Sequence, residues 1–364
     1  MNLSVILPTY NRLGQLKQVL AGLEAQTEPL DSFEVIVVSD GSPDGTDDYL
    51  RALETPLRVT AVFQPNQGVA ATRNHGLAKA TGDLVLFIDD DVVPAPELIA
   101  RHRAAHVRLG PKAIVMGPML SPAPEQFAMA PWVQWEQAML MKQYNDMIAG
   151  NWQPTARQFY TGNTSLRRAH LLASGGFDAS FRRAEDVELA YRLADLGLTF
   201  HFEPEAIGYH YAQRSFASWS AIPYAYGRND VIFTRDKGQN WLLTTIFTEF
   251  HGRHSLIRNL AQLCLDRAAL SKIALHSLKL AGSLGHKIGN ETISRMAYSA
   301  IFNLRHYQGI ADELGGRNQF FQAVAANTPS LALPLSGVGD LAPSPSQGEG
   351  WGEGKLSTPK ETTH

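Results

Sequence analysis

The ten residues from Gly82 to Asp91 read GDLVLFIDDD, an apolar run that ends in three consecutive aspartates. A short apolar run between polar residues is typical of a buried β-strand. Adjacent carboxylates repel one another, so a proton or a bound cation must relieve the repulsion. This stretch therefore predicts a buried strand whose end carries a charged site.

Similar apolar runs precede this strand, with helices between them. The expected elements alternate between strand and helix: Ser4–Leu7, Leu13–Ala25, Phe33–Val38, Asp44–Leu53, Arg58–Phe63 and Val69–Ala80. Strands that are apolar throughout and joined by helices indicate a parallel sheet covered on both faces. We therefore predict an α/β fold with a Rossmann-like, doubly wound, mostly parallel sheet. Ligands of such sheets bind beyond the carboxyl ends of the strands.

Polar clusters follow each of the four expected strands. They are Pro8–Arg12, Ser39–Thr46, Gln67–Asn74 and Asp89–Asp91. Any one of them could be only a turn or a helix cap, because Asp-Gly pairs and asparagines favour such positions. All four fall on the same edge of the predicted sheet, and this coincidence favours a binding site there.

The rest of the chain changes in character along its length. Residues 121–158 are rich in proline, methionine and aromatics, and we expect one helix flanked by loops. Residues 216–330 have a mostly helical pattern and are predicted to form a C-terminal helical extension. After Asn327 the composition turns to proline, serine and glycine without periodicity, so residues 331–364 are predicted to be a disordered tail.

Composition excludes several classes of function. The net charge of −3 over 364 residues argues against a nucleic-acid partner, because phosphate binding needs a basic surface. The N-terminus lacks a signal-peptide pattern and no long apolar run is present, so we expect a cytoplasmic protein. No Gly-x-Gly-x-x-Gly or Walker-type motif follows the first strand, which argues against dinucleotide oxidoreductases and the usual ATPases.

Five sequence blocks, in order, resemble those of the inverting glycosyltransferases of family 2, which have the GT-A fold. They are Val5–Arg12, Val37–Ser42, Gly82–Asp91, Thr161–Arg168 and Gly175–Asp178 through Glu185–Leu189, and the resemblance covers residues 2–211. It implies a metal-dependent enzyme that moves a sugar from a nucleoside-diphosphate sugar to an acceptor hydroxyl. It also implies a catalytic domain over 1–215, with a nucleotide-sugar half (1–120) and an acceptor half (121–215).

The resemblance assigns roles to individual residues. Tyr10 matches the position that stacks on the nucleobase, and Asp40 the acid that hydrogen-bonds it. Asp89 and Asp91 match the Asp-x-Asp motif, in which the first acid faces the ribose and the second holds the metal. The role of the middle residue stays open. The residues expected to bind the nucleotide sugar are Pro8, Thr9, Tyr10, Arg12, Asp40, Arg73, Asp89 and Asp90.

The expected cofactor is Mn²⁺ or Mg²⁺, since hard divalent ions take one or two protein carboxylates plus substrate phosphates. The resemblance gives Asp91, Asp89 and His210 as ligands. A solvated acidic turn and a structural histidine remain alternatives. For catalysis it points to the Glu185–Asp186 pair, and we favour Asp186 as the base that deprotonates the acceptor. Simple capping of the following helix is the alternative.

Two other functions share parts of this pattern. A nucleotidyltransferase has a similar sheet, but usually carries a glycine-rich basic loop where this chain has Pro8–Asn11. A non-catalytic sugar-nucleotide or glycan-binding module is disfavoured by the joint presence of the acids named above. The resemblance suggests a role in cell-surface polysaccharide or lipopolysaccharide synthesis, with a glycan or lipid-linked acceptor.

The stretch Ser255–Leu280 has apolar residues at helical spacing and charges that are almost all basic. A basic amphipathic helix can lie on anionic lipid at the inner face of a membrane. It can equally pack on the catalytic domain, and this second interpretation is favoured because most amphipathic helices cover a core.

Overall fold

The computed structural model describes residues 1–328, and the predicted disordered tail (331–364) lies outside the described residues. The strands are β1 Leu3–Thr9, β2 Phe33–Ser39, β3 Val59–Phe63, β4 Leu84–Ile88, β5 Val92–Pro94, β6 Ala113–Met116, β7 Met119–Leu120, β8 Asn163–Arg167, β9 Thr199–Phe202 and β10 Gly208–His210. The helices are α1 Leu13–Glu24, α2 Thr46–Arg51, α3 Val69–Lys79, α4 Leu98–Leu109, α5 Pro131–Ile148, α6 Arg168–Ala173, α7 Glu185–Asp195, α8 Phe216–Asp236, α9 Trp241–Gly252, α10 Ser255–Cys264, α11 Ala268–Lys287, α12 Glu291–Leu314 and α13 Arg317–Ala326, with short 3₁₀ turns at Leu30–Ser32 and Ala156–Gln158.

The central sheet has the strand order β3-β2-β1-β4-β8-β6-β9. The first four strands in this order are parallel, as predicted from their apolar runs. Strand β8 runs antiparallel to both of its neighbours, β4 and β6, and was not foreseen from the sequence. The prediction of an α/β fold with a mostly parallel sheet is confirmed.

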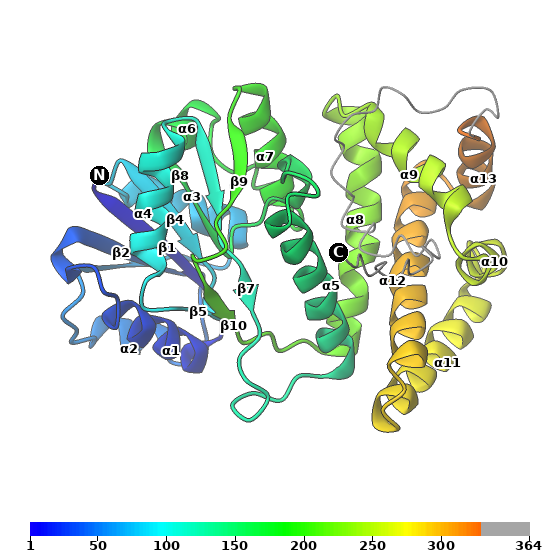
Figure 1. Ribbon diagram of the computed structural model, residues 1–364, viewed down its shortest axis with the longest axis horizontal. Helices are drawn as coiled ribbons and strands as arrows, with labels where there is room; N and C mark the ends of the chain where they lie inside the picture. The colour runs from blue at the N-terminus through cyan, green and yellow to red at the C-terminus, as the bar shows by residue number, and fades with distance from the viewer. Residues whose placement is uncertain (329–364) are drawn as a thin grey trace, which may run out of the picture.

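Both faces of the sheet are covered, which explains why its strands are apolar throughout. Along β1, Val5 and Leu7 point to one face and pack with residues of α1, α2 and α4. Ile6 points to the other face, into a core shared with α3 and α7. Each such aliphatic side chain contributes about 1.5–3 kcal/mol when it is fully buried. Burial on both faces therefore fixes the layered arrangement seen in Figure 1.

A second, three-stranded sheet has the order β5-β10-β7. Strand β5 begins directly after the three aspartates. It pairs antiparallel with β10, so that Val92 lies opposite His210. The backbone N–H of Tyr211 donates to the carbonyl of Asp91 at 2.8 Å. This pairing brings the end of β10 to the carboxyl end of β4.

The C-terminal helices form a layer beside the sheet, with α12 between α8 and α11 (Figure 1). Helices α8 and α12 approach closely through two glycines: a Cβ on Gly227 would lie 2.0 Å from the carbonyl oxygen of His306, and one on Gly309 2.0 Å from that of Tyr224. Trp135 of α5 and Trp219 of α8 pack edge to face, which joins α5 to this layer. Over residues 1–328, none of the helices is both long and apolar enough to span a bilayer.

The expectation of one continuous helix over Ser255–Leu280 is wrong. The chain turns at Leu265–Arg267 and forms two helices, α10 and α11, with Asp266 in the left-handed conformation at φ 58°. The carboxylate of Asp266 accepts a hydrogen bond from the backbone N–H of Arg317 at the start of α13. This tertiary contact holds a break that helical periodicity alone does not reveal.

The glycine contact between α8 and α12 gives a test of the packing. Gly309→Ala places a methyl group against the α8 backbone, and we expect it to lower the free energy of unfolding by about 1–3 kcal/mol, as overpacked cores do. Gly252→Ala is the matched control, because an added Cβ there has no atom within 4 Å. Urea denaturation measures both variants, and equal stabilities would contradict the close contact.

Candidate active site

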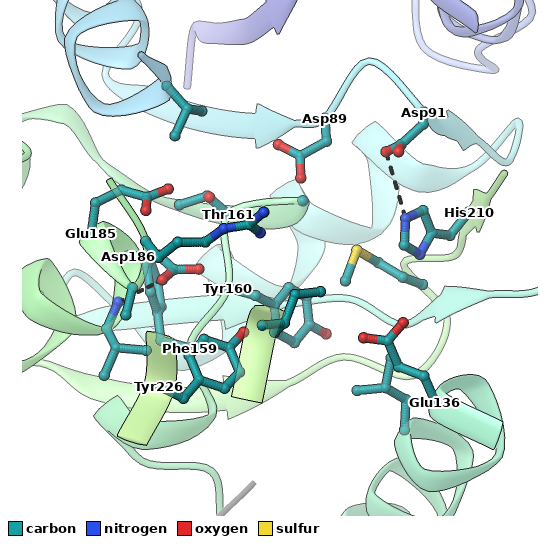
Figure 2. Close-up of a pocket in the computed structure, with 18 of the residues that line it drawn as sticks. Asp89, Asp91, Glu136, Phe159, Tyr160, Thr161, Glu185, Asp186, His210 and Tyr226 are labelled. Atoms are coloured by element: carbon teal, nitrogen blue, oxygen red, sulfur yellow. Dashed lines mark hydrogen bonds and ion pairs between the residues drawn. The ribbon is translucent and has the colours of Figure 1, made fainter. Parts of the chain in front are cut away.

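A cavity of about 780 Å³ lies at the carboxyl ends of the parallel strands. Its size falls within the usual range for small-molecule sites. All of the site residues predicted from the sequence line it: Pro8, Thr9, Tyr10, Arg12, Asp40, Arg73, Asp89, Asp90, Asp91, Glu185, Asp186 and His210. Figure 2 shows Asp89 and Asp91 on one side, with Glu185 and Asp186 across the cavity from Asp89.

Arg73 of α3 joins the two acidic groups. Its side chain is 4% exposed, and its guanidinium donates to Asp89 at 2.8 Å and to Glu185 at 2.7 Å. Asp89 ends β4, whereas Glu185 begins α7, so this one side chain connects segments about a hundred residues apart. Charge-assisted bonds of this kind are strong where water is excluded. The distance between the two acidic groups is therefore fixed by the protein itself.

Arg12, after β1, neutralises the other two aspartates. Its Nη1 lies 2.9 Å from Asp90 and 2.6 Å from Asp91. Burial raises the pKa of Asp90 to about 6, although the charge of Arg12 acts in the opposite direction. Burial also disfavours the charged form of Asp91, but its interaction with His210 and the charges of Arg12 and Arg214 outweigh this and lower its pKa. Asp91 is therefore held as the anion.

His210 lies beside Asp91 because of the pairing of β10 with β5. Its Nε2 is 3.6 Å from the Asp91 carboxylate, as the dashed line in Figure 2 marks. Gln137 of α5 holds the other side of the ring, with its amide nitrogen 3.2 Å from Nδ1 of His210. The imidazole is thus fixed at both nitrogens, with Nε2 facing the aspartates.

This pair has the donor chemistry of a divalent-cation site. Over residues 1–328 no group of three or more His, Cys, Asp or Glu side chains is arranged to hold an ion, and Asp89 is engaged by Arg73. Mg²⁺ and Mn²⁺, however, need only one or two protein ligands when phosphates supply the rest. Ligation through Nε2 of His210 would place the proton on Nδ1, where Gln137 can accept it after its amide rotates. The Oε1 of Gln137 is buried and has no other partner, so the residues present fit such an ion.

Asp40 makes its hydrogen bonds within the chain. Its carboxylate accepts from the backbone N–H groups of Gln67 and Gly68 and from the side chain of Gln64. These bonds shape the turn that begins α3 and so position Arg73. The side chain of Tyr10, in contrast, is 48% exposed at the rim of the cavity. A ring there is free to stack on a ligand.

The Glu185–Asp186 pair begins α7 directly after a strained residue. Ala184 has φ 59°, a conformation that costs a non-glycine residue about 1–3 kcal/mol and that often marks a functional site. Asp186, in the first turn of α7, accepts a hydrogen bond from the N–H of the adjacent Val187 at 2.8 Å, whereas the N-cap residue, Ala184, makes no side-chain capping bond. The side chain of Asp186 also lines the cavity, so this bond does not remove it from the site.

The environment of Asp186 suits proton transfer. Burial is the main influence that raises its pKa to about 7, the neighbouring Glu185 carboxylate adds to the rise, and the charge of Arg73 opposes it. A carboxylate with a pKa near neutrality exchanges protons efficiently at physiological pH. The geometry thus provides a group that can accept a proton inside the cavity.

Part of the cavity wall comes from residues that sequence reasoning missed. Helix α5 contributes Glu136 and Gln137, and α8 contributes Tyr226. Arg214 donates to Glu136 at 2.5 Å. Burial, then the charges of Asp186 and Glu136, raise the pKa of Tyr226, so its hydroxyl stays protonated beside the acidic pair. The concentration of aromatic residues and methionines at 131–152 was the available signal for α5, whereas nothing local marks Tyr226.

Removing Arg73 tests whether the site depends on its two ion pairs. Arg73→Met leaves the buried Glu185 carboxylate without its partner, and we expect a loss of about 3–5 kcal/mol in the free energy of unfolding. Arg51→Met is the control, because the Arg51 side chain is exposed and its ion pairs contribute no more than about 1 kcal/mol. Urea unfolding distinguishes them, and similar losses would show that the pairs are not tightly coupled to the fold.

Comparisons with known proteins show which proteins the chain resembles. Residues 4–172 match the family model described as Glycosyl transferase family 2. The chain is 34% identical over 229 residues to a validoxylamine A glucosyltransferase of Streptomyces hygroscopicus subsp. jinggangensis, a match covering 57% of this chain and 54% of the relative. It is 28% identical over 258 residues to an uncharacterized glycosyltransferase, YfnE, of Bacillus subtilis, with coverage of 58% and 64%.

The chain thus spans between a half and two thirds of the length of these curated relatives. Among solved structures, S. aureus TarS 1–349 in complex with UDP-GlcNAc superimposes with a TM-score of 0.53 at 19% identity, over 90% of this chain and 91% of that one. This similarity shows that the two chains share a GT-A type fold. Residues 4–172 are thus the part of the chain that matches glycosyl transferase family 2.

Proposed function

We propose that this protein is an inverting glycosyltransferase that moves a sugar from a nucleoside-diphosphate sugar to an acceptor hydroxyl. The observation that carries the proposal is the bridge from Asp89 through Arg73 to Glu185, which holds the strand-end acids beside the acidic pair in one cavity. The family match at 4–172 supports this activity class. So do the relatives, which are named as glycosyltransferases.

The residues divide the work in this proposal. Asp186 accepts the proton of the acceptor hydroxyl as that oxygen attacks the anomeric carbon. Tyr10, at the rim, stacks on the nucleobase, while Arg73 places positive charge near the diphosphate. Asp91 and His210 would hold Mn²⁺ or Mg²⁺, which when bound would stabilise the charge of the leaving diphosphate. In the same way, residues 1–120 would bind the donor and residues 121–215 the acceptor. Helix α8, in the helical extension (216–330), would complete the part of the cavity wall that faces the acceptor.

The direct test is release of nucleoside diphosphate from a panel of sugar nucleotides, with and without acceptors. UDP-GlcNAc belongs in the donor panel and validoxylamine A among the acceptors, because the compared proteins are named with these compounds. A glycan acceptor and a lipid-linked one complete the panel. Acceptor-dependent release supports transfer. Binding of donors without turnover would favour a non-catalytic module, and release of pyrophosphate a nucleotidyltransferase.

The role of Asp186 predicts a specific pH dependence. A general base works only when deprotonated, so turnover should fall as the pH drops below about 7, the pKa to which burial raises Asp186. Asp186→Asn should leave donor binding unchanged and lower turnover by about 10²–10⁴-fold.

Glu185→Gln is the matched variant for this test. It removes the negative charge that helps to raise the pKa of Asp186, so the acidic limb of the pH–rate profile should move to lower pH. An unchanged limb in Glu185→Gln, or weakened donor binding with normal turnover in Asp186→Asn, would assign the pair to capping.

Metal removal is the next prediction. We expect activity to be lost in excess chelator and restored by Mn²⁺ or Mg²⁺. Asp91→Asn should weaken Mn²⁺ binding, measured by electron paramagnetic resonance with nucleoside diphosphate present, more than Asp90→Asn does. The reason is that both aspartates contact Arg12, but only Asp91 also faces His210, the second expected ligand. Full turnover in chelator would remove the metal from this proposal.

A further inference from the structure

Helix α11 exposes four of its large apolar side chains to solvent. Leu270, Ile273, Leu280 and Leu284 are 43%, 63%, 57% and 59% exposed, and Ile288 just after the helix is 61% exposed. Spacings of three, seven and four residues place these side chains on one side of the helix. Large apolar surfaces of this kind on soluble proteins mark sites of interaction. We call these five residues the α11 stripe.

The buried residues of α11 are small. They are Ser271, Gly282 and Gly285. A Cβ on Gly282 would lie 2.8 Å from the ring of Tyr298, and one on Gly285 2.8 Å from the backbone nitrogen of Ser294. The glycines thus let α11 approach α12 closely, while Leu275 and Leu278 pack inward and the five residues of the stripe point away. The exposure of the α11 stripe is therefore not a sign of loose packing.

The surroundings of the α11 stripe are basic. Residues 255–296 contain six lysines and arginines but only two acids, in a chain whose net charge is −3. The basic residues are Arg258, Arg267, Lys272, Lys279, Lys287 and Arg295, and the acids are Asp266 and Glu291. The carboxylate of Asp266 is engaged by the backbone of Arg317. Positive charge is thus concentrated on the segment that also exposes the apolar stripe.

We propose that the α11 stripe docks on an anionic lipid surface, with α11 lying flat in the interface. Apolar side chains beside lysines suit the boundary between acyl chains and anionic headgroups. A helix of 20 residues is about 30 Å long, so the whole stripe can enter one plane. Isologous pairing with a second copy would instead bring two like-charged segments together. Charge thus favours lipid over a second copy as the occupant.

The docked surface lies next to the cavity wall. Lys279 of α11 is 5.7 Å from the ring of Trp132, in α5, and 4.7 Å from that of Phe216, in α8. Other residues of α5 and α8 line the cavity. Figure 1 shows α11 on the side of the helical layer away from the sheet. If the proposed function holds, docking would keep the acceptor side of the cavity at the membrane surface, where a lipid-linked acceptor lies. Docking itself does not depend on that function.

The test is co-sedimentation of the full chain with vesicles of phosphatidylcholine, with and without phosphatidylglycerol, at low and high salt. We expect binding to the anionic vesicles only, weakened by salt. The triple variant Ile273→Gln, Leu280→Gln, Leu284→Gln should lower the partition coefficient at least about tenfold. Each substitution removes an apolar side chain that would be buried in lipid in the docked state. Leu172→Gln, at an apolar residue of α6 that is 51% exposed, is the control and should bind as the unaltered protein does.

Further measurements separate the other occupants. Thermal unfolding checks that the triple variant remains folded. The double variant Lys272→Gln, Lys287→Gln should weaken binding to anionic vesicles while leaving the α11 stripe intact. Absence of vesicle binding, or equal binding to neutral vesicles, would overturn the proposal. A dimer detected by sedimentation velocity and abolished in the triple variant would also overturn it. Vesicle binding that appears only when the chain is truncated after Thr328 would overturn it as well. Release of nucleoside diphosphate with a soluble acceptor should be unchanged in the triple variant, so docking and catalysis fail independently.

Discussion

The geometry of the cavity depends on one buried cation. Arg73 extends from α3 between the end of β4 and the start of α7, and it is the counter-ion of an acid on each. Its own position is set one step earlier, because Asp40 at the end of β2 binds the N–H groups that begin the turn into α3. Without the guanidinium, the carboxylates of Asp89, Glu185 and Asp186 would repel one another. The ends of β2 and β4, helix α3 and the start of α7 are thus held together by these hydrogen bonds and ion pairs.

The first 120 residues were predictable because physical rules act locally there. A strand buried on both faces must be apolar throughout, and the polar residues that follow it must lie at the edge where the strand ends. This logic places Asp40 and Asp89–Asp91 at one edge from the sequence alone, and all of them line the cavity. The family resemblance then supplied Glu185, Asp186 and His210, which no local pattern could connect to that edge.

What the sequence did not reveal depends on long-range contacts. Strand β8 inserts between β4 and β6 and runs antiparallel to both. The pairing of β10 with β5 brings His210 to Asp91, and it depends on backbone hydrogen bonds between segments distant in the sequence. Asn163 lies within the Thr161–Arg168 block, and its amide donates to the carbonyls of Pro118 and Ala206, so it fastens loops together. Helical periodicity likewise could not locate the break at Asp266, because a carboxylate contact with α13 determines it.

The glycine contact between α8 and α12 limits how the wall of the cavity can vary. Tyr226 immediately precedes Gly227, whose Cα hydrogens face the α12 backbone. Any rotation or sliding of α8 would drive a backbone into its neighbour, so Tyr226 occupies a rigid frame. Recognition of a different ligand would therefore have to arise by exchanging side chains, for example along α5, where Glu136 and Met139 line the cavity. In this chain one helix serves as a fixed template and the facing helix as the place where specificity can evolve.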